Sequence, residues 1–565
     1  MWRTWCTAFG WFAVLLCVCV GGVVWLAQPT PAQPASAALP FFDTGDFAGS
    51  GTCEACHNGL VDEAGTPVGI PDDWRATMMA NSARDPLWQA RVSVEVSRTL
   101  AISPTIEATC ARCHTPMASA QAAVSGETVA LLGDGFLNPD HPLHAAALDG
   151  VSCTLCHQII SDTFAAPGDG NFVIDTGTSP PDRLLYGPFD NVLADPMRQM
   201  VGFTPVLGEQ MEDAALCGTC HNLTTTTVRA DGTPTGHQFP EQRTYDEWEA
   251  SAFGDGVGDD DQSCQACHMP PAEGSVPLAS IPNDLPPRAP FHRHTFTGAN
   301  VFMLRILRDH ADTLGVPASV EQMNRAITES LGFLQSETAH LHVQTALVSD
   351  TLVLTVTVQN LTGHKFPSGY PSRRAWLHVV VSDTTGAPIF ESGAPLPDGR
   401  IAGNDADQNA AQFEPHYTLI TDTTQVQVYE SIMQDADGNV TYTLLRAATY
   451  AKDNRLLPRG FDKANAPAEI GVYGAAQSDT DFVGGSDRVV YRLPGNGDAL
   501  YQVRVALLYQ TLAAPFADDV LATETPQSAA WRALYETADR QPVVIAEARG
   551  VAARYQTWLP LAVSP

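Results

Sequence analysis

Five pentapeptides of the form Cys-x-x-Cys-His distinguish this sequence of 565 residues, and they contain ten of its 13 cysteines. Two thiols three residues apart lie on one side of a single helical turn. There they can form thioethers with the two vinyl groups of one haem, and the histidine that follows lies under the iron as its proximal ligand. The pattern therefore predicts five covalently attached haems c.

The predicted attachment residues are Cys53, Cys56, Cys110, Cys113, Cys153, Cys156, Cys217, Cys220, Cys264 and Cys267. The predicted proximal iron ligands are His57, His114, His157, His221 and His268. A random chain of this composition would contain about 0.01 such pentapeptides, so chance does not explain five of them. Zinc sites or disulfide-exchange sites are the alternative interpretation, but neither requires a histidine after every second cysteine.

The segment that carries the pentapeptides provides little protein for each haem, because successive first cysteines are only 43 to 64 residues apart. Clusters of Pro and Gly between the pentapeptides indicate loops. We therefore expect residues 41–299 to form one pentahaem unit of loops and short helices. In this unit the haems pack against one another and replace the usual aliphatic core.

The rest of the chain changes its periodicity twice. Residues 300–340 have apolar positions at helical spacing, interrupted near Gly315, which predicts two connecting helices. From residue 341 the period is two, which predicts an immunoglobulin-like β-sandwich over residues 341–565. The strand-like segments are 352–359, 376–382, 425–429, 440–445, 488–493 and 501–509. The expected fold class is therefore α+β, with several domains.

Residues 1–40 are expected to direct export. Residues 4–27 are apolar or small, and a spacer rich in Pro and Ala follows them. About 20 apolar residues are enough to span a bilayer, so the segment fits either a cleaved signal peptide or a retained membrane anchor. In both cases we expect the bulk of the chain outside the cytoplasm, in the periplasm, outside the cell or anchored facing outward.

The charge balance restricts the partners. The chain has 31 Lys and Arg against 63 Asp and Glu, a formal net charge of -32. Such a chain cannot neutralise phosphates, which excludes a nucleic-acid role. Haem propionates, about two per haem, would add negative charge except where Arg pairs with them. We therefore expect a basic redox partner protein or a cationic acceptor.

Several short motifs near the pentapeptides and beyond them resemble those of the multihaem c-type cytochromes of bacteria and archaea. The resemblance covers roughly residues 45–510. It is carried by residues 74–80, 150–153, 240–242, 245–248, 267–270, 294–300 and 363–369. It implies electron transfer through a chain of haems, and it does not name a substrate.

The second axial ligand of each iron, the distal ligand, must come from elsewhere in the chain. His364 lies in a loop between a Gly and a Pro, and His144 precedes the third pentapeptide by nine residues. The resemblance implies that His294 is a terminal ligand and that Met79 stands where relatives carry a ligand histidine; a thioether there would raise that haem's potential. Met78 is the nearest competitor, and the alternative is that both methionines are helix core. The candidates, in order, are His294, His364, His144, Met79, His416 and His292.

Two acidic clusters could bind Ca²⁺ through carboxylate oxygens. One comprises Asp255 with residues 259–261, and the other comprises Asp405 with Asp407. Neither has the spacing of an EF-hand, and solvated acidic loops are the alternative interpretation.

Three functions fit these features. The leading one is an exported electron-transfer protein, in which electrons pass along five haems to a redox partner or an extracellular acceptor. We favour this non-catalytic role because no other catalytic constellation is evident. The second is a haem-based reductase or oxidoreductase of a small nitrogen or sulfur compound at one haem with open coordination. All five pentapeptides end in His, however, and the Cys-x-x-Cys-Lys motif of pentahaem nitrite reductases is missing. The third is a subunit of a haem filament, a membrane complex or a homo-oligomer.

Overall fold

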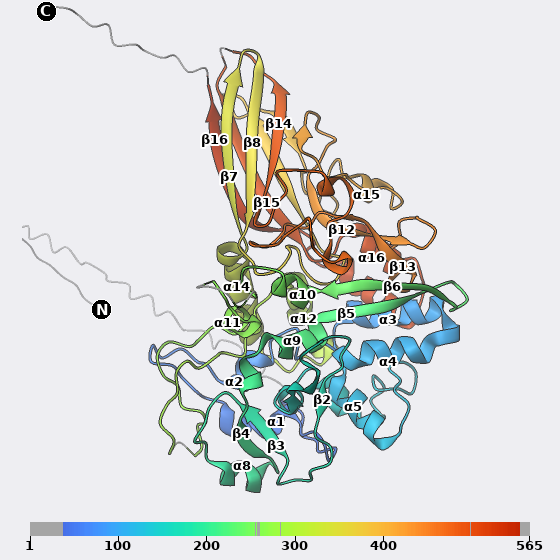
Figure 1. The fold of residues 1–565 in the computed structure, drawn as a ribbon, viewed down its shortest axis with the longest axis vertical. Helices are drawn as coiled ribbons and strands as arrows, with labels where there is room; N and C mark the ends of the chain where they lie inside the picture. The colour runs from blue at the N-terminus through green and yellow to red at the C-terminus, as the bar shows by residue number, and fades with distance from the viewer. Residues whose placement is uncertain (1–37, 255, 257–259, 283, 498, 554–565) are drawn as a thin grey trace, which may run out of the picture. The chain divides into compact units, whose positions relative to one another are not determined.

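The computed structural model describes residues 38–553, apart from positions 255, 257–259, 283 and 498. The predicted export segment, residues 4–27, lies outside the described residues. Helices and several β-sheets make up a mixed structure (Figure 1), which confirms the α+β part of the predicted fold class. Within the described ranges, we find no helix with both the length and the apolar character needed to cross a bilayer.

Each pentapeptide lies at the end of a short helix. Four of these helices end at the proximal histidine: α1 (Ser50–His57), α4 (Ser103–His114), α9 (Ala214–His221) and α11 (Cys264–His268). The fifth, α7 (Cys153–Cys156), ends one residue before His157. The two thiols and the imidazole therefore come from the last turn of a helix, as the spacing predicts.

The other elements before residue 300 are equally short. The helices are α2 (Ile70–Trp74), α3 (Pro86–Arg98), α5 (Pro116–Ser125), α6 (His144–Leu148), α8 (Ala194–Met200) and α10 (Thr244–Glu249). Three strand pairs accompany them: β1 (Ile159–Ile160) with β2 (Val173–Ile174), β3 (Leu184–Gly187) with β4 (Thr204–Leu207), and β5 (Asn222–Val228) with β6 (Pro234–Arg243). Helix α3 is the longest of these helices, and the Asp85 side chain caps it by accepting hydrogen bonds from the first-turn backbone.

Three helices occupy the segment 300–340, where two connecting helices were predicted. Helix α12 (Val301–Asp309) is followed by His310 and the short helix α13 (Ala311–Leu314). Gly315 ends α13, and its φ of 65° places it in the left-handed conformation. Helix α14 (Val320–Glu337) then begins with a capping box formed by Ser319 and Gln322.

Two β-sheets follow. The four-stranded sheet has the order β11-β14-β8-β7, and the six-stranded sheet has the order β13-β12-β9-β15-β16 with β10 paired to β9. The strands are β7 (Ala339–Val348), β8 (Thr351–Asn360), β9 (Arg374–Ser382), β10 (Pro388–Ser392), β11 (Leu419–Ile420), β12 (Val428–Asp435), β13 (Ala447–Asp453), β14 (Ser486–Pro494), β15 (Tyr501–Gln510) and β16 (Val543–Ala552). Strands β7, β8 and β14 lie side by side in Figure 1, as their register requires.

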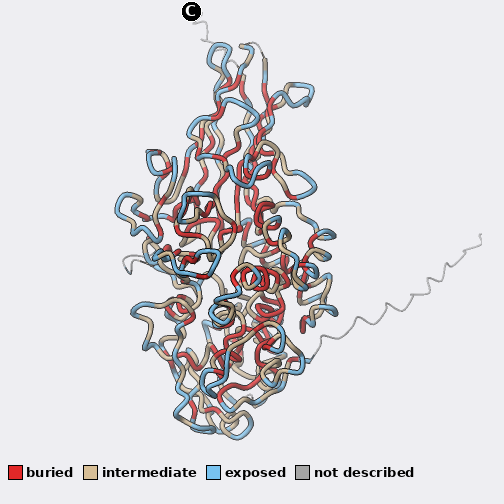
Figure 2. Tube along the Cα trace, turned by 90° about the vertical axis from the view of Figure 1, so that its right-hand side faces the viewer, coloured by how far each residue is buried: buried red, intermediate tan, exposed pale blue. Residues whose placement is uncertain are grey.

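The two sheets pack on a common hydrophobic core. Alternate residues of β8, from Leu352 to Val358, are buried, as the period of two predicts. Contacts between the sheets include the rings of Phe390 and Tyr491, 6.2 Å apart, and the Tyr429 hydroxyl, which donates to Asp487. Buried and more exposed residues alternate along the strands in Figure 2.

Two features of the C-terminal part differ from the sequence prediction. Helices α16 (Ala514–Leu521) and α17 (Pro526–Tyr535) follow β15, in a region where only strands were predicted. The strand predicted at 440–445 is wrong, because a 3₁₀ turn occupies Leu444–Arg446 and β13 begins after it. Helices α16 and α17 pack on α3, where Arg91 pairs with Asp519 at 2.7 Å. The hydrophobic core thus continues from α3 into the sheets, and the division at residues 299/300 and 340/341 stays a prediction.

Candidate functional site

The five pentapeptides face one cavity of about 2470 Å³. All ten of their cysteines and all five of their histidines line it, and none of these cysteines is in a disulfide. A cavity for one drug-sized ligand has a volume of about 300–1,000 Å³, so this one has room for several macrocycles. Ten thiols and five imidazoles on its walls are the donor set that covalent haem c requires.

The proximal histidines are oriented for a metal. The Nδ1 atoms of His57, His114, His157 and His268 each contact a backbone carbonyl oxygen, at 2.5 to 3.1 Å. A carbonyl can only accept, so Nδ1 carries the hydrogen and Nε2 keeps its lone pair for an iron. His221 differs from these four, because its Nδ1 atom lies 3.2 Å from the side-chain amide nitrogen of Gln242, which can only donate. The orientation therefore applies to His57, His114, His157 and His268.

Burial keeps these imidazoles neutral. It lowers the pKa of His114 and of His221 to about 4, and it also lowers the pKa of the other three. Because a neutral imidazole is the form that ligates a metal, protonation does not prevent these histidines from binding iron at neutral pH.

Two of the candidate distal histidines lie opposite proximal ones. The rings of His157 and His294 have centroids 6.3 Å apart and are 19° from parallel; those of His268 and His364 are also 6.3 Å apart, at 7°. Two imidazoles on opposite faces of one iron have centroids about 6 Å apart, because each nitrogen lies about 2 Å from the metal and about 1 Å from its ring centre. Both pairs therefore have the spacing of a bis-histidine iron site.

A buried network of charges holds the His364 loop in place. The Nδ1 atom of His364 donates to the Lys365 carbonyl oxygen at 2.9 Å, and the Lys365 amine, which is fully buried, pairs with Asp453 at 2.8 Å. Arg455 bridges Asp453 and Glu247, both at 2.8 Å, and Glu247 accepts the backbone N–H of Lys365. Burial opposes ionisation of Asp453, but the charges of Arg455 and Lys365 lower its pKa to about 2.

The structure places two more of the candidates on the cavity wall. Met79 lines the cavity together with Met78, and its carbonyl oxygen accepts the Val151 N–H, close to the third pentapeptide. Met78 also packs against the hydrophobic core. His292 lines the cavity as well, and its Nδ1 atom contacts the Met269 carbonyl oxygen at 2.7 Å, as in the proximal histidines.

His144 lies elsewhere. Its Nδ1 atom contacts the Phe136 carbonyl oxygen at 2.8 Å, and the residue is not among those that line the cavity. The proximity of His144 to the third pentapeptide in sequence therefore does not bring it to the cavity wall.

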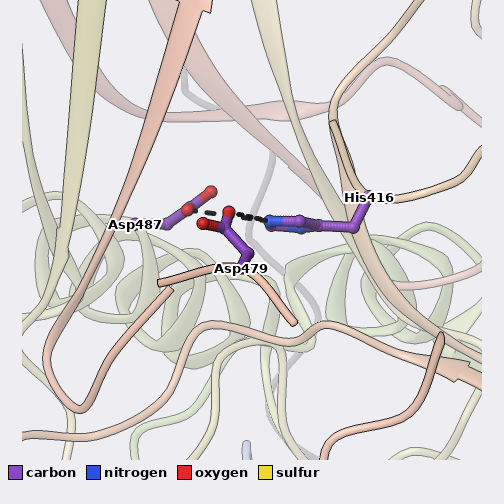
Figure 3. Close-up of side chains that lie close together, drawn as sticks. All are labelled: His416, Asp479 and Asp487. Atoms are coloured by element: carbon purple, nitrogen blue, oxygen red, sulfur yellow. Dashed lines mark hydrogen bonds and ion pairs between the residues drawn. The ribbon is translucent and has the colours of Figure 1, made fainter. Parts of the chain in front are cut away.

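His416 does not fit the role of a distal ligand, and this is a correction to the sequence prediction. It is buried between the two sheets, where Nε2 contacts Asp479 at 2.9 Å and Asp487 lies at 3.8 Å (Figure 3). The Nδ1 atom accepts from the side-chain amides of Gln427 and Asn454, at 2.9 and 3.1 Å. Both ring nitrogens are therefore engaged away from the cavity.

The same hydrogen bonds argue against a metal at this cluster. The amide oxygens of Gln427 and Asn454 accept the backbone N–H groups of Tyr417 and Glu430, so their NH₂ groups must face His416. Nδ1 of His416 is then an acceptor, Nε2 carries the hydrogen, and the ring has no lone pair to direct at the carboxylates.

The predicted Ca²⁺ clusters receive no support from the structure. Asp407 is buried and pairs with Arg374 at 2.8 Å, so it is not available beside Asp405. In the other cluster, Asp255 and Asp259 lie outside the described residues, and Asp260 pairs with Arg459.

Contacts between the pentapeptides themselves were not predicted. Hydrogen bonds join the thiols of Cys53 with Cys153, Cys113 with Cys220, and Cys217 with Cys264, and these contacts, together with burial, raise the pKa of the first thiol of each pair. Cys156 also lies near Cys220. Helix α9 is therefore adjacent to the second, third and fifth pentapeptides.

A second unpredicted feature is a set of charged and aromatic side chains beside the second pentapeptide. The ring of Trp88 on α3 stacks on His114, with centroids 4.5 Å apart. Further along α3, Arg91 and Glu95 line the cavity, and so does Glu241 on β6. The sequence signal was present, since residues 240–242 belong to a family-like motif, but nothing in the sequence linked that motif to α3.

Comparison with known proteins shows a family similarity in one part of the chain. Residues 52–158, which contain the first three pentapeptides, match the family model described as cytochrome c554 and c-prime. Among solved structures, the chain is similar to a penta-haem cytochrome c552 from Thermochromatium tepidum, with 16% identity and a TM-score of 0.49 over 90% of this chain and 100% of that one. No curated protein matched.

Removing His364 should leave one iron without its second imidazole. In His364→Ala, we expect one haem of the loaded protein to change from low spin to high spin and to bind CO, with the haem content unchanged. Electron paramagnetic resonance and CO-difference spectra measure this. His342→Ala, on strand β7 and away from the cavity wall, is the control; a wholly low-spin His364→Ala protein would refute the pairing with His268.

Breaking the buried network at Lys365 should destabilise the protein. In Lys365→Met, Glu247 and Asp453 keep only Arg455 as a cation, and loss of one partner from a buried ion pair costs about 3–5 kcal/mol. The free energy of unfolding from denaturant titration measures this cost. Arg504→Met removes an exposed ion pair with Glu547 and should have little effect. If both substitutions lower the free energy of unfolding equally, the buried network stabilises the protein no more than an exposed ion pair does.

Proposed function

We propose that this chain is a multihaem c-type cytochrome that transfers electrons along five covalently bound haems c to a redox partner protein or an extracellular acceptor; the family match over residues 52–158 and the five pentapeptides support this. The observation that carries the proposal is one cavity lined by all five pentapeptides, in which thiols of the first and third, of the second and fourth, and of the fourth and fifth pentapeptides are in contact. Haems attached at these thiols would lie edge to edge, and an electron could pass between them without a separate carrier.

The residues of the cavity have distinct roles in this proposal. Each cysteine pair fixes one macrocycle through two thioethers, and each proximal histidine provides an axial ligand. His294 and His364 would complete bis-histidine sites with His157 and His268. Met79 and His292 remain candidates for two of the other irons. Haem iron supplies the one-electron redox chemistry, and the protein tunes it through ligand type and burial.

The number of haems is open to a direct test. We expect five haems per chain from the pyridine haemochrome assay and a corresponding mass increase in the denatured protein, because thioether attachment survives unfolding. Cys217→Ala together with Cys220→Ala should remove one haem by both measurements. Fewer than five haems in the unsubstituted chain would contradict the proposal.

The acceptor is expected to be basic. The net charge of -32 favours association with cationic surfaces and makes that association sensitive to salt. In stopped-flow mixing, the reduced protein should transfer electrons to a basic redox protein much faster than to an acidic one. Raising the salt concentration from about 0.01 to 0.15 M shortens the Debye length from about 30 to 8 Å. This change should slow electron transfer to the basic partner only. Rates that depend neither on the charge of the partner nor on the salt concentration would contradict an electrostatic docking site.

A haem-based reductase is the second candidate, and one observation favours it. Among the described histidines other than the proximal five, only His292, His294 and His364 line the cavity, so two irons lack a second imidazole. An iron without a distal side chain could bind a small nitrogen or sulfur compound. Turnover of nitrite or hydroxylamine by the loaded protein would establish this activity, whereas wholly low-spin haems that bind neither CO nor cyanide would rule it out.

The remaining parts of the proposal concern organisation. We infer an immunoglobulin-like domain at residues 341–565, which the two packed sheets support, beside a pentahaem unit at 41–299 and a connector at 300–340. Export through residues 4–27, as a signal or an anchor, would bring the chain to the compartment where haem c is attached. A filament, a membrane complex or a homo-oligomer remains a proposal that the size of the purified protein would test.

A further inference from the structure

Glu241 occupies an irregular position at the cavity wall. In the β5–β6 pair, Pro240 lies opposite Thr224 and Gln242 lies opposite Leu223, so Glu241 is the extra residue of a β-bulge. Bulges re-aim a side chain out of the regular alternation of a strand. The side chain of Glu241 lines the cavity while the residue is only 8% exposed.

The groups around Glu241 come from three elements and one loop. Helix α3 contributes Glu95 and Arg91, α4 contributes Cys110, strand β13 contributes Tyr450, and the loop before β9 contributes Tyr370. The one cation among them is already used, because Arg91 pairs with Asp519 at 2.7 Å and lies 3.6 Å from Glu95.

The carboxyl of Glu241 differs from the two other carboxylates near Cys110. Glu107 accepts the backbone N–H groups of Leu131 and Leu132, at 2.6 and 2.9 Å. Glu95 accepts the N–H of Leu444 at 2.9 Å. Among the described residues, none gives Glu241 a hydrogen bond or an ion pair through its side chain. Burial, with a smaller contribution from Glu95, raises the pKa of Glu241 to about 7.

We propose that Glu241 is a redox-linked proton acceptor for the haem attached at Cys110 and Cys113. Glu241 binds one proton from water when one electron, from an external one-electron donor, reduces that haem, and it releases the proton to water when the electron leaves. Each proton that moves offsets the charge of one electron, and only the O–H bond of the carboxyl forms or breaks. The inference rests on the proposed electron-transfer function and adds to it the uptake and release of a proton.

The sign of the coupling follows from electrostatics. An added electron makes the neighbourhood of Glu241 more negative, which disfavours its carboxylate and so raises its pKa. At an effective dielectric constant of about 20, a unit charge roughly 10 Å away changes a proton affinity by about tenfold. The potential of this haem must therefore fall as the pH rises between the pKa of the oxidised and that of the reduced protein.

The test is a spectroelectrochemical titration of the haem-loaded protein at several pH values from 5.5 to 9. We expect one of the haem potentials to fall between about pH 6 and 8. Because the proton affinity changes about tenfold, the reduction equilibrium constant should change by about tenfold in total over this range, which is about 59 mV for a one-electron couple. In Glu241→Gln this dependence should vanish, while Glu241→Asp and Glu107→Gln should retain it.

Each other outcome has a definite meaning. The same dependence in Glu241→Gln, or its loss in Glu95→Gln or Glu107→Gln, would overturn the assignment to Glu241. If Glu241→Gln fails to load haem, proton release and uptake on reduction of the unsubstituted protein decide the question: no uptake near pH 7 overturns the proposal. Haems that exchange electrons at pH-independent potentials would refute the proton coupling alone. Haems that exchange no electrons would refute the proposed function as well.

Discussion

The parallel imidazoles of His268 and His364 join two parts of the chain that are almost 100 residues apart in sequence. One ring ends the helix of the fifth pentapeptide, and the other lies in the loop after strand β8. Their 6.3 Å separation is set from both sides, by the Thr297 carbonyl oxygen behind His268 and by the Lys365 carbonyl oxygen behind His364. The sheets that carry the loop and the short helices that carry the pentapeptides must therefore keep a fixed relation for an iron to fit between them.

The buried charges show how a strongly acidic chain keeps its interior balanced. Lysine occurs at only three positions, and two of them, Lys365 and Lys452, are fully buried beside Asp453 and Glu430. A buried charge is tolerable when a partner and further hydrogen bonds compensate its lost hydration. The third, Lys463, donates to two backbone carbonyl oxygens. The outer surface thus depends on arginine for its positive charge, which reinforces its anionic character.

Sequence reasoning succeeded where a local pattern has a local consequence. The pentapeptide spacing predicted thiols and imidazole on one helical turn, the period of two predicted β8, and Gly315 predicted the break between helices. It failed where the outcome depends on distant partners. His416 and His144 have the same side chain as His294, and only the fold decides which of them reaches the cavity. Helices α16 and α17 were missed because their apolar residues face α3, more than 400 residues earlier in the chain.

The position of α9 gives the haem arrangement a particular connectivity. Its two thiols neighbour those of the second and fifth pentapeptides. The third pentapeptide also lies close to α9, and its first thiol contacts that of the first pentapeptide. If a haem is attached at each pentapeptide, as we propose, the five centres would form a branched network with its junction at the fourth pentapeptide. Loss of that centre would isolate the other branches from one another, whereas loss of the second or the fifth would remove one branch and leave the others connected.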